Sequence, residues 1–534
     1  MPYIPSIISG SLPQPNGPHS VGYFTLTHAP FPGQGFVLSS PTIDTNLPGN
    51  AAYGLHSTTP DNASWKTGHV PALGLRRVEY SVWYPCEVPK GWFGRDASPS
   101  GVGWLPTPVQ DVLDGYARFA NDSPWLRAAY PLLRVLGGRI SIPVHPAAKP
   151  LETIIPPLSD SKNPQKPPLI IFSHGLAGTH LTYSHICRAL ASQGNVVLSI
   201  SHQDGSGPVA SIPHDDASCA LWAERAGGVV RGRKRDGPVG GNDGKGKGVG
   251  SIISRSGDAT SESKTDSAPF KLSYLRHNEL DWSPDSTPDV MTLRSLQLDI
   301  RVHELYATYT SFRSLITHGP ASLPGLVMSA GSGLVPKADA AEFLQALRGK
   351  VDVDSLDFVG HSFGGGTVLW ALQRDVPEGE EKLPVKKAVA LDPWVEPMPM
   401  PAPVKGKKDA PDVPLFVMNS PRFTLWSTHF SRLNRLIRDS HGTLLTLIGA
   451  RHESFSDFPL LVNPSSAYGI MTTIDSLVGA FLRGDVREHE KVRGKEEDRG
   501  VLKTTTKDAR GKETGKRELV GEWGDVVVHE LGRT

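Results

Sequence analysis

The sequence predicts an α/β protein in which helices flank a mostly parallel central sheet. A short, wholly apolar run at 169–172 and a second, largely apolar run at 196–200 are separated by a helical stretch at 181–193. Strands that are apolar on both faces and alternate with helices are typical of a buried parallel sheet. The same alternation resumes at residue 290 and continues to about residue 482.

The other expected elements follow from local pattern. Residues 78–84 alternate β-branched and aromatic side chains and end at Pro85, which predicts a strand. Apolar and aromatic residues recur at helical intervals over 113–136 and again over 290–315. Further strands are expected at 356–359, 388–391, 415–417 and 444–448, and further helices at 367–373, 428–438 and 467–482.

We expect one catalytic domain at residues 76–483, with loops and tails around it. The 55 Gly and 47 Pro among 534 residues favour long loops over several compact domains. Residues 1–75 are expected to form a loop-rich segment that packs on the core. Residues 225–270 include a basic cluster at 231–235 and predict a disordered insertion, because they offer little apolar area to bury. Residues 484–534 predict a charged, flexible tail.

Composition excludes several classes of protein. With 55 basic and 54 acidic residues the net charge is +1, so we expect no nucleic-acid partner. No apolar run approaches the 18 or so residues that span a bilayer, and the N-terminus has no signal-peptide pattern. The three cysteines, Cys86, Cys187 and Cys219, have no metal-binding spacing. We therefore expect a cytoplasmic protein without a metal or other cofactor.

The chain contains one Gly-x-Ser-x-Gly motif, at residues 360–364, with Ser362 at its centre. It follows an apolar run and precedes a helix-forming stretch, which is the strand–turn–helix context that a nucleophilic serine requires. The tight turn needs glycines for close backbone approach, and the following helix N-terminus favours a developing negative charge. The pattern predicts that Ser362 is a nucleophile.

A serine nucleophile needs a general base and an acid that orients the base, in the chain order Ser, acid, His. Asp392 follows the expected strand at 388–391, and His452 follows the one at 444–448, so we assign them these roles. The alternative acids are Asp357, Glu396 and Asp457, and the alternative bases are His429 and His441. Asp357 lies inside a strand, and both alternative histidines lie in or beside an expected helix.

An oxyanion hole requires two backbone N–H donors. The residue after the nucleophile, Phe363, supplies one. The loop after the strand at 169–172 supplies the other, for which we choose Leu176, with Ala177 as the alternative. His174 lies in this loop, and we expect it to shape the loop and not to act as the base.

Seven blocks of the sequence resemble the platelet-activating factor acetylhydrolase family of the plasma and intracellular type II kind. The blocks are residues 17–22, 82–86, 168–176, 360–368, 390–394, 414–420 and 452–458. The 360–368 block with its Asp-Pro-Trp partner at 392–394, and the block from His452 to Phe458, are more specific than the serine motif alone. Ala177 departs from the glycine common in the family, and the insertion and the tail have no recognised counterpart.

This resemblance implies an α/β-hydrolase fold and calcium-independent phospholipase A2 activity. The implied reaction removes acetyl, short or oxidised acyl chains from the sn-2 position of glycerophospholipids, as a 1-alkyl-2-acetylglycerophosphocholine esterase does. By matching positions it assigns Ser362, Asp392 and His452 to the triad, and Leu176 and Phe363 to the oxyanion hole. It implies no cofactor.

The expected partner is a phospholipid substrate. The stretch 113–136, with Trp125, Leu126, Tyr130 and Leu133, is a candidate for peripheral membrane contact, and packing of this stretch on the sheet is the alternative. Two other functions stay open: a carboxylesterase or lipase acting on other short-chain esters, and an inactive hydrolase-fold scaffold.

Overall fold

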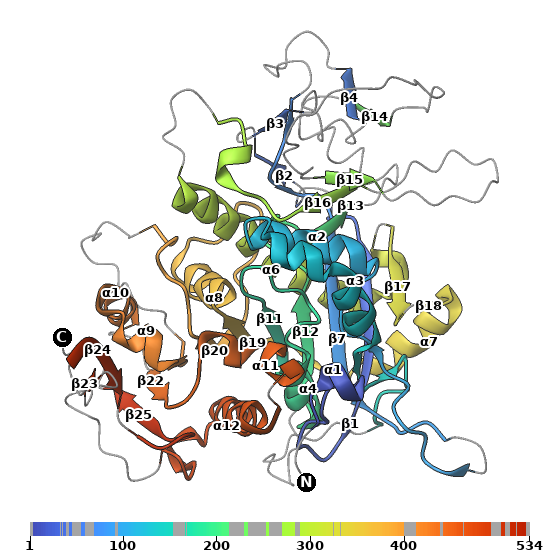
Figure 1. Cartoon of the computed structure of the whole chain (residues 1–534). Coiled ribbons are helices and arrows are strands. Elements are labelled where there is room, and N and C mark those ends of the chain that lie inside the picture. The colour runs from blue at the N-terminus through green and yellow to red at the C-terminus, as the bar shows by residue number, and fades with distance from the viewer. Residues whose placement is uncertain are drawn as a thin grey trace.

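The computed structural model describes most of the chain, and Figure 1 shows its elements. The described residues are 4–31, 69–90, 94–152, 168–212, 270–282, 289–323, 325–331, 333–399, 413–437, 442–462, 464–492 and 521–529, together with 34, 36–38, 42–44, 55–58, 166, 229–232, 253–255, 503–507 and 513–519. Cys219 and the greater part of the 225–270 segment lie outside them.

A large mixed sheet forms the centre of the molecule (Figure 1). Six of its strands are parallel neighbours, in the order β12 (Val196–Ile200), β11 (Pro168–Ser173), β19 (Asp352–His361), β20 (Val385–Leu391), β21 (Leu415–Asn419) and β22 (Gly442–Leu447). β7 (Val78–Cys86) pairs antiparallel with β12. This sheet, with helices on its faces, confirms the expected α/β-hydrolase fold.

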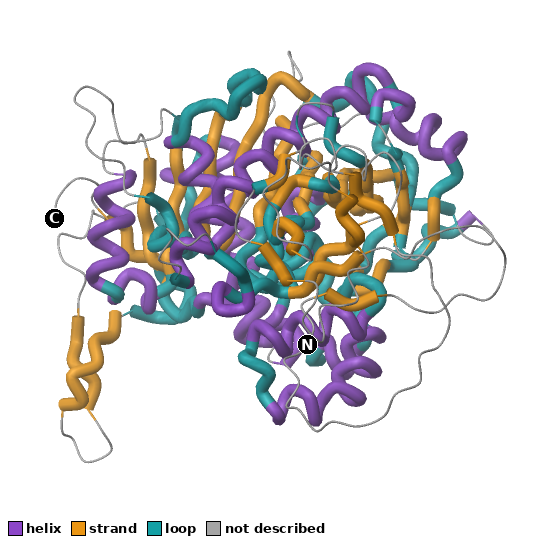
Figure 2. Tube along the Cα trace, turned by 90° about the horizontal axis from the view of Figure 1, so that it is seen from above, coloured by secondary structure: helices purple, strands orange, loops and turns teal. Residues whose placement is uncertain are grey.

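The two faces of the sheet bury alternate residues of the same strands, as a strand's period of two requires. In β11, Leu169 and Ile171 belong to one apolar core, whereas Ile170 and Phe172 belong to the other. Figure 2 shows helices on both sides of the strand layer. The first core includes residues of α6 (Val290–His318), α7 (Lys337–Leu347), α8 (Phe363–Gln373) and α10 (Ser427–Ile437), and the second includes residues of α4 (Ser184–Ser192) and α12 (Pro464–Arg483).

The N-terminal segment contributes a full strand to the sheet, which the loop-rich expectation for 1–75 missed. β1 (Ser20–His28) pairs antiparallel with β7 along its whole length, and most of its residues are buried. The sequence of β1 resembles that of an exposed edge strand, because threonines and a histidine interrupt its apolar residues. β17 (Val327–Ala330) pairs with its other side, so β1 is an interior strand.

The expected helical stretch at 113–136 is in fact two helices, α2 (Val109–Phe119) and α3 (Pro124–Arg139). Between them Asn121 and Asp122 have φ angles of 53° and 55°, which end the first helix. Asp122 accepts from Arg127 of α3 and from Arg276, so the corner is fixed by ion pairs. The side chains of Trp125 and Leu126 lie outside the described residues.

The chain's last described strand also belongs to the sheet. β25 (Val526–His529) pairs antiparallel with the edge strand β22, and Val526 is buried. The expectation of a flexible tail over 484–534 is wrong for this strand. Two other described tail segments, β23 (Lys503–Lys507) and β24 (Glu513–Leu519), pair with each other.

The parts of the 225–270 segment that the structure describes are two short strands. β14 (Val229–Gly232) pairs with β4 (Leu55–Thr58), and β15 (Ile253–Arg255) pairs with β16 (Phe270–Ser273). These seven residues and Phe270, the first residue of β16, are therefore ordered as strands, and the remainder of the segment lies outside the described residues. The other short elements are α1 (Ser6–Ser9), β2 (Phe36–Val37), β3 (Thr42–Asp44), β5 (His69–Pro71), β6 (Gly74–Leu75), β8 (Val102–Gly103), β9 (Ser141–Ile142), β10 (His145–Pro146), β13 (Val209–Ile212), β18 (Gly333–Leu334), α9 (Pro421–Leu425) and α11 (Phe458–Val462).

Among the described helices, none combines the length and the apolar character needed to cross a bilayer.

Candidate active site

Ser362 lies on a strained turn between β19, which ends at His361, and α8, which begins at Phe363. Its φ and ψ are 55° and −118°, an uncommon conformation for a residue with a side chain. A Cβ at Gly360 would lie 2.3 Å from the carbonyl oxygen of Gly364, and one at Gly364 would lie 2.0 Å from that of Ser173. Both glycines of the motif are therefore required by backbone packing.

A continuous chain of hydrogen bonds joins the serine to a buried carboxylate. The Nε2 atom of His452 lies 2.9 Å from the Ser362 hydroxyl, and its Nδ1 lies 2.9 Å from Asp392 Oδ2. Asp392 follows β20, is fully buried, and accepts from the backbone N–H and the hydroxyl of Ser420, both at 2.7 Å. Because Asp392 makes these bonds, the imidazole can donate from Nδ1 and accept the serine proton at Nε2.

The alternative acids and bases lie elsewhere. Asp457 accepts from Ser184 and His185 at the start of α4. His429 pairs with Glu396 at 2.8 Å. Asp357 is buried within β19, and burial raises its pKa to about 7. His441 lies outside the described residues.

The loop after β11 lies directly against the serine. A Cβ on Gly175 would lie 3.0 Å from the Cβ of Ser362. The N–H of Ala177 donates to the carbonyl of Ser206 at 2.8 Å, so it is already engaged. This favours Leu176 over Ala177 as the second expected oxyanion donor, beside the expected donor Phe363 at the start of α8. Ala177 has a φ of 56°, the region that favours glycine.

His174 contacts its own loop and not the serine. Its Nδ1 donates to the carbonyl of Gly175 at 2.8 Å, and its Nε2 accepts from the N–H of His202 at 3.3 Å. Burial, with the nearby Arg301, holds the pKa of His174 well below its ordinary value. A neutral imidazole with both nitrogens engaged fits the loop-shaping role expected for it.

Two rings contact the imidazole of His452. Phe423 stacks on it with 4.6 Å between centroids, and His361 lies against it at 4.7 Å. His361 is in turn held by the Tyr183 hydroxyl, 2.8 Å from its Nδ1. Burial, together with the nearby His452, holds the pKa of His361 well below its ordinary value, so the His361 imidazole is neutral.

A cavity of about 570 Å³ opens at Ser362, at the edge of the sheet where the parallel strands have their carboxyl ends. Its wall also includes Leu176, His452 and Glu453. The rest is largely aromatic and is formed by Tyr116, Phe119, Tyr183, Trp394, Phe423, Trp426 and Phe458. Such a surface suits an apolar ligand next to a polar reaction centre.

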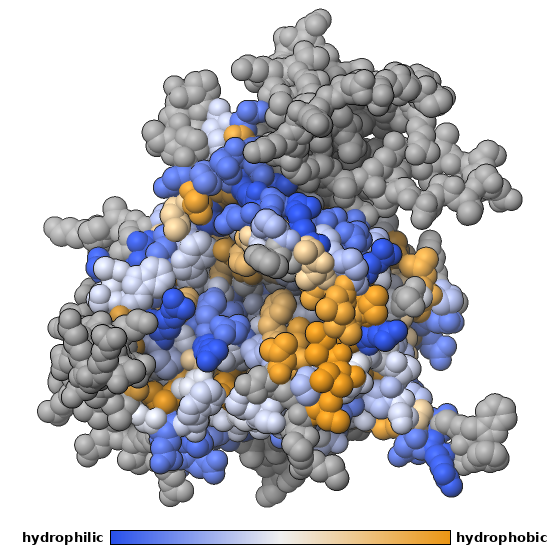
Figure 3. All heavy atoms as spheres, in the orientation of Figure 1, coloured by the Kyte–Doolittle hydropathy of each residue, from blue (hydrophilic) through white to orange (hydrophobic). Residues whose placement is uncertain are grey.

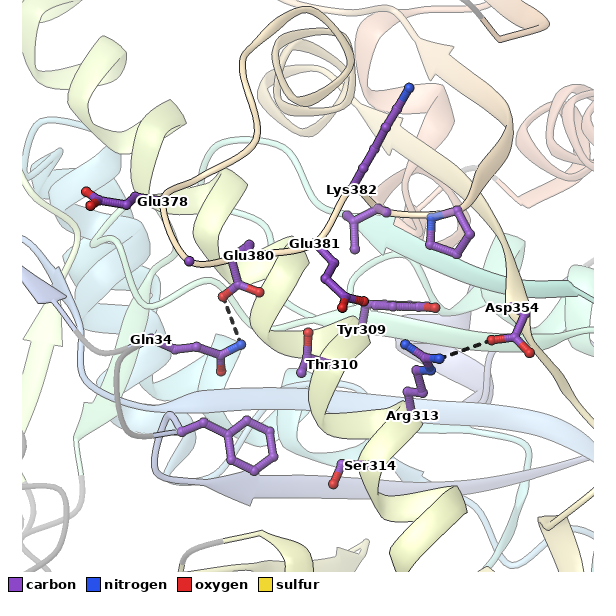
Figure 4. Close-up of a pocket in the computed structure, with 14 residues that line it drawn as sticks. Gln34, Tyr309, Thr310, Arg313, Ser314, Asp354, Glu378, Glu380, Glu381 and Lys382 are labelled. Atoms are coloured by element: carbon purple, nitrogen blue, oxygen red, sulfur yellow. Dashed lines mark hydrogen bonds and ion pairs between the residues drawn. The ribbon is translucent and has the colours of Figure 1, made fainter.

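A second cavity of about 650 Å³ lies near the amino ends of the strands, beside Asp354 in the first half of β19 and Pro384 just before β20 (Figure 4). Six charged side chains are among those that line it, and Arg313 pairs there with Asp354. No histidine is among the described residues that line it. The site of the expected chemistry is therefore the cavity at Ser362.

Sequence reasoning missed the residues that hold the triad in place. Ser420 follows β21 and binds Asp392. It belongs to the 414–420 block of the family resemblance, but the resemblance assigned no role to this residue. Tyr183 and Phe423 contact the site from distant parts of the chain, and nothing in their local sequence marks them.

The sequence model of the family described as platelet-activating factor acetylhydrolase, isoform II, matches residues 99–223 and 289–476, more than half of the chain. The chain belongs to this family. The interval between the two matched segments contains the 225–270 segment that we expected to be an insertion.

Curated relatives agree with this membership. A Gallus gallus protein named platelet-activating factor acetylhydrolase is 23% identical over 331 residues, which cover 61% of this chain and 59% of that protein. A Bos taurus protein of the same name is 26% identical over 306 residues, which cover 57% and 51%. The chain thus spans little more than half the length of these relatives. A solved ferulic acid esterase from Streptomyces cinnamoneus has a TM-score of 0.44 and 14% identity over 90% of this chain and 94% of that one.

Proposed function

We propose that this chain is a serine esterase that hydrolyses the sn-2 acetyl or short or oxidised acyl ester of glycerophospholipids. One observation carries the proposal: the hydrogen-bonded chain Ser362–His452–Asp392 opens into an aromatic cavity in a member of this family. The comparisons support an ester hydrolase, and the cavity at Ser362 supports an ester with an apolar part.

The proposed mechanism begins when His452 Nε2 takes the proton of Ser362 as its oxygen attacks the ester carbonyl. The carbonyl becomes an oxyanion that accepts from the N–H groups of Leu176 and Phe363. His452 then gives its proton to the departing lysophospholipid oxygen, which leaves an acyl-serine. Asp392 fixes the imidazole tautomer and stabilises the imidazolium ion.

The second half of the mechanism repeats these steps with water. A water molecule gives a proton to His452 and attacks the acyl-serine carbonyl, and the new oxyanion binds the same two N–H groups. Collapse of this intermediate returns the proton to Ser362 and releases the free acid. In both halves Asp392 accepts the hydrogen bond from His452 Nδ1 and takes up no proton itself.

Ser362→Ala tests the proposal directly, with a 2-acetyl phospholipid and p-nitrophenyl acetate as substrates. We expect turnover to fall by about ten-thousandfold or more, and labelling by a fluorophosphonate probe to disappear. Ser314→Ala, in the second cavity, is the matched control and should retain both. Near-normal turnover in Ser362→Ala would contradict the assignment, and a wild-type chain that the probe does not label would be an inactive scaffold.

The substrate class is tested separately by a panel of phospholipids that differ only in sn-2 chain length. We expect kcat/KM to be highest for acetyl and short or oxidised chains. If small soluble esters or triacylglycerol are hydrolysed faster than every phospholipid, the chain is a carboxylesterase or lipase instead.

We further propose that the chain docks on a phospholipid surface through an apolar patch formed by Ile4, Ile8, Leu132, Val135 and Val462. All five side chains are exposed. Figure 3 shows apolar side chains gathered over α1, α3 and α11. Phe458 begins α11, the helix that ends at Val462, and it lines the Ser362 cavity. Docking there would bring a lipid to the cavity without a path through water.

Leu132→Ser/Val135→Ser tests the docking by co-sedimentation with phosphatidylcholine vesicles. We expect vesicle binding to fall at least fivefold while hydrolysis of dissolved p-nitrophenyl acetate is unchanged. Val327→Ser/Leu334→Ser removes two exposed apolar side chains on β17 and β18 and should bind normally. Equal binding by all three proteins would contradict this docking surface.

A further inference from the structure

The two proposed oxyanion donors come from different parts of the chain, and one buried side chain contacts both parts. Arg301 lies in α6 and is fully buried. It does not line the Ser362 cavity. Its guanidinium group contacts both the loop that carries Leu176 and the ring of Phe363.

On the loop side, Arg301 fixes the backbone around Leu176. Its Nη1 donates to the carbonyl of His174 at 2.6 Å, and its Nη2 donates to the hydroxyl of Ser206 at 2.6 Å. The carbonyl of Ser206 accepts the N–H of Ala177 at 2.8 Å. The backbone is therefore held two residues before Leu176 and one residue after it.

On the helix side, the same guanidinium packs on the other donor residue. The central carbon of the group lies 4.4 Å from the centroid of the Phe363 ring. A cation over an aromatic face at this distance is attracted by the ring, more strongly where water is excluded. Phe363 is fully buried, so displacement of the guanidinium would alter the packing at the first turn of α8.

The positive charge of Arg301 is compensated within the same cluster. Asp204 is fully buried and accepts from Arg301 Nε at 2.9 Å. Its other carboxylate oxygen accepts from the N–H of Ser206 at 3.0 Å and from the Ser206 hydroxyl. Gln297, one turn before Arg301 in α6, donates to the Asp204 carbonyl at 2.7 Å. Removing two charged groups from water costs free energy, so a buried charge pair of this kind suggests a specific geometric role.

We propose that Arg301, with Asp204 and Ser206, positions the N–H groups of Leu176 and Phe363 to bind the oxyanion. The inference rests on the proposed function and names positioning residues, since none of the three is proposed to touch substrate. An oxyanion hole works only if its donors are fixed where the charge develops. Arg301 holds both donor segments from α6, a helix that is adjacent in sequence to neither of them.

The experiment compares Arg301→Met, Arg301→Lys and Ser206→Ala with Arg188→Met. Arg188 is another fully buried arginine, and it binds the carbonyls of Ser184 and Pro13, away from the oxyanion loop. Each variant is measured for kcat, KM, thermal midpoint and inhibition by a trifluoromethyl ketone, which forms a tetrahedral adduct with the serine.

We expect Arg301→Met to lower kcat by about 10- to 100-fold, and Ser206→Ala by several-fold, with KM within threefold of normal. Ketone affinity should fall in parallel with kcat, because the adduct uses the same two donors. Arg301→Lys should lie between wild type and Arg301→Met. Arg188→Met should lose thermal stability but keep kcat and ketone affinity within threefold.

The positioning role is overturned if folded Arg301→Lys and Ser206→Ala keep normal kcat and ketone affinity. It is also overturned if Arg188→Met loses kcat to the same degree at an equal loss of thermal midpoint. Should Arg301→Met fail to fold, the two milder variants decide. A failure of the proposed function is recognised separately, because Ser362→Ala would then retain activity or wild type would have none.

Discussion

The imidazole of His452 lies parallel to the phenyl ring of Phe423, with 4.6 Å between centroids and 4° between planes. The ring of His361 also lies against it, with 4.7 Å between centroids, and its two nitrogens bind Ser362 and Asp392. The imidazole is thus held by two ring contacts and at both nitrogens. A base held in this way spends more of its time in the reactive geometry.

Phe423→Leu should lower kcat about tenfold, because a smaller side chain lets the imidazole tilt away from the serine. Steady-state kinetics on p-nitrophenyl acetate measures the change. Phe430→Leu is the matched control, since Phe430 is also half-buried but contacts His529 instead. Equal kcat in the two variants would mean that stacking on His452 has no positioning effect.

Asp392→Asn should lower kcat by about ten-thousandfold with little change in fold. If the amide oxygen keeps the bond from the Ser420 N–H, the amide nitrogen faces His452 Nδ1 and favours the tautomer with a proton on Nε2. That tautomer cannot accept the serine proton. Glu396→Gln, which removes the charge from the pair with His429, should keep kcat within threefold. A similar loss in both variants would contradict the selection of Asp392.

Asp357→Asn should stabilise the protein at pH 8 but not at pH 4. Burial raises the pKa of Asp357 to about 7, against the opposing effect of Lys387. The folded state therefore binds this proton more tightly than the unfolded chain. The stability that the protonated carboxyl gives is present below pH 4 and is lost as pH rises through 7.

Denaturant midpoints at a series of pH values test this expectation. The free energy of unfolding of Asp357→Asn should exceed that of wild type by about 2–4 kcal/mol at pH 8, because asparagine cannot ionise. Asp354→Asn, an exposed position in the same strand, should show no such trend. A difference that is independent of pH would show that Asp357 does not titrate in this range.

Gly364→Ala should abolish activity and reduce the yield of folded protein, because its Cβ would lie 2.0 Å from the Ser173 carbonyl oxygen. Gly469→Ala, within α12, meets no atom within 4 Å. It should raise the free energy of unfolding by about 0.5–1 kcal/mol, since alanine favours a helix. Activity and thermal midpoint report both effects, and an active, well-folded Gly364→Ala would contradict the tight turn at Ser362.

The positions of Ser362, Asp392 and His452 could be predicted because each follows an apolar strand in the chain order typical of this fold. Parallel strands place their carboxyl ends at one edge, so strand ends alone bring the three residues together. The same reasoning led to the loop after β11, which we propose carries an oxyanion donor and which the structure places against Ser362.

The remainder depends on contacts between distant segments, which a local pattern does not encode. β1 is an interior strand only because β7 and β17 pair with its two sides. The corner at Asn121 and Asp122 interrupts apolar spacing that is compatible with one helix. Arg301 looks like an ordinary surface residue of a long helix, and only the folded chain brings Asp204 to it.

The pairing of β25 with β22 has a consequence while the protein is being synthesised. During synthesis β22 emerges about eighty residues before β25, so its outer edge has no partner while the intervening chain is translated. An open edge invites pairing with another chain. The nascent sheet is therefore most exposed to misassembly late in translation, when the residues of the site have already left the ribosome.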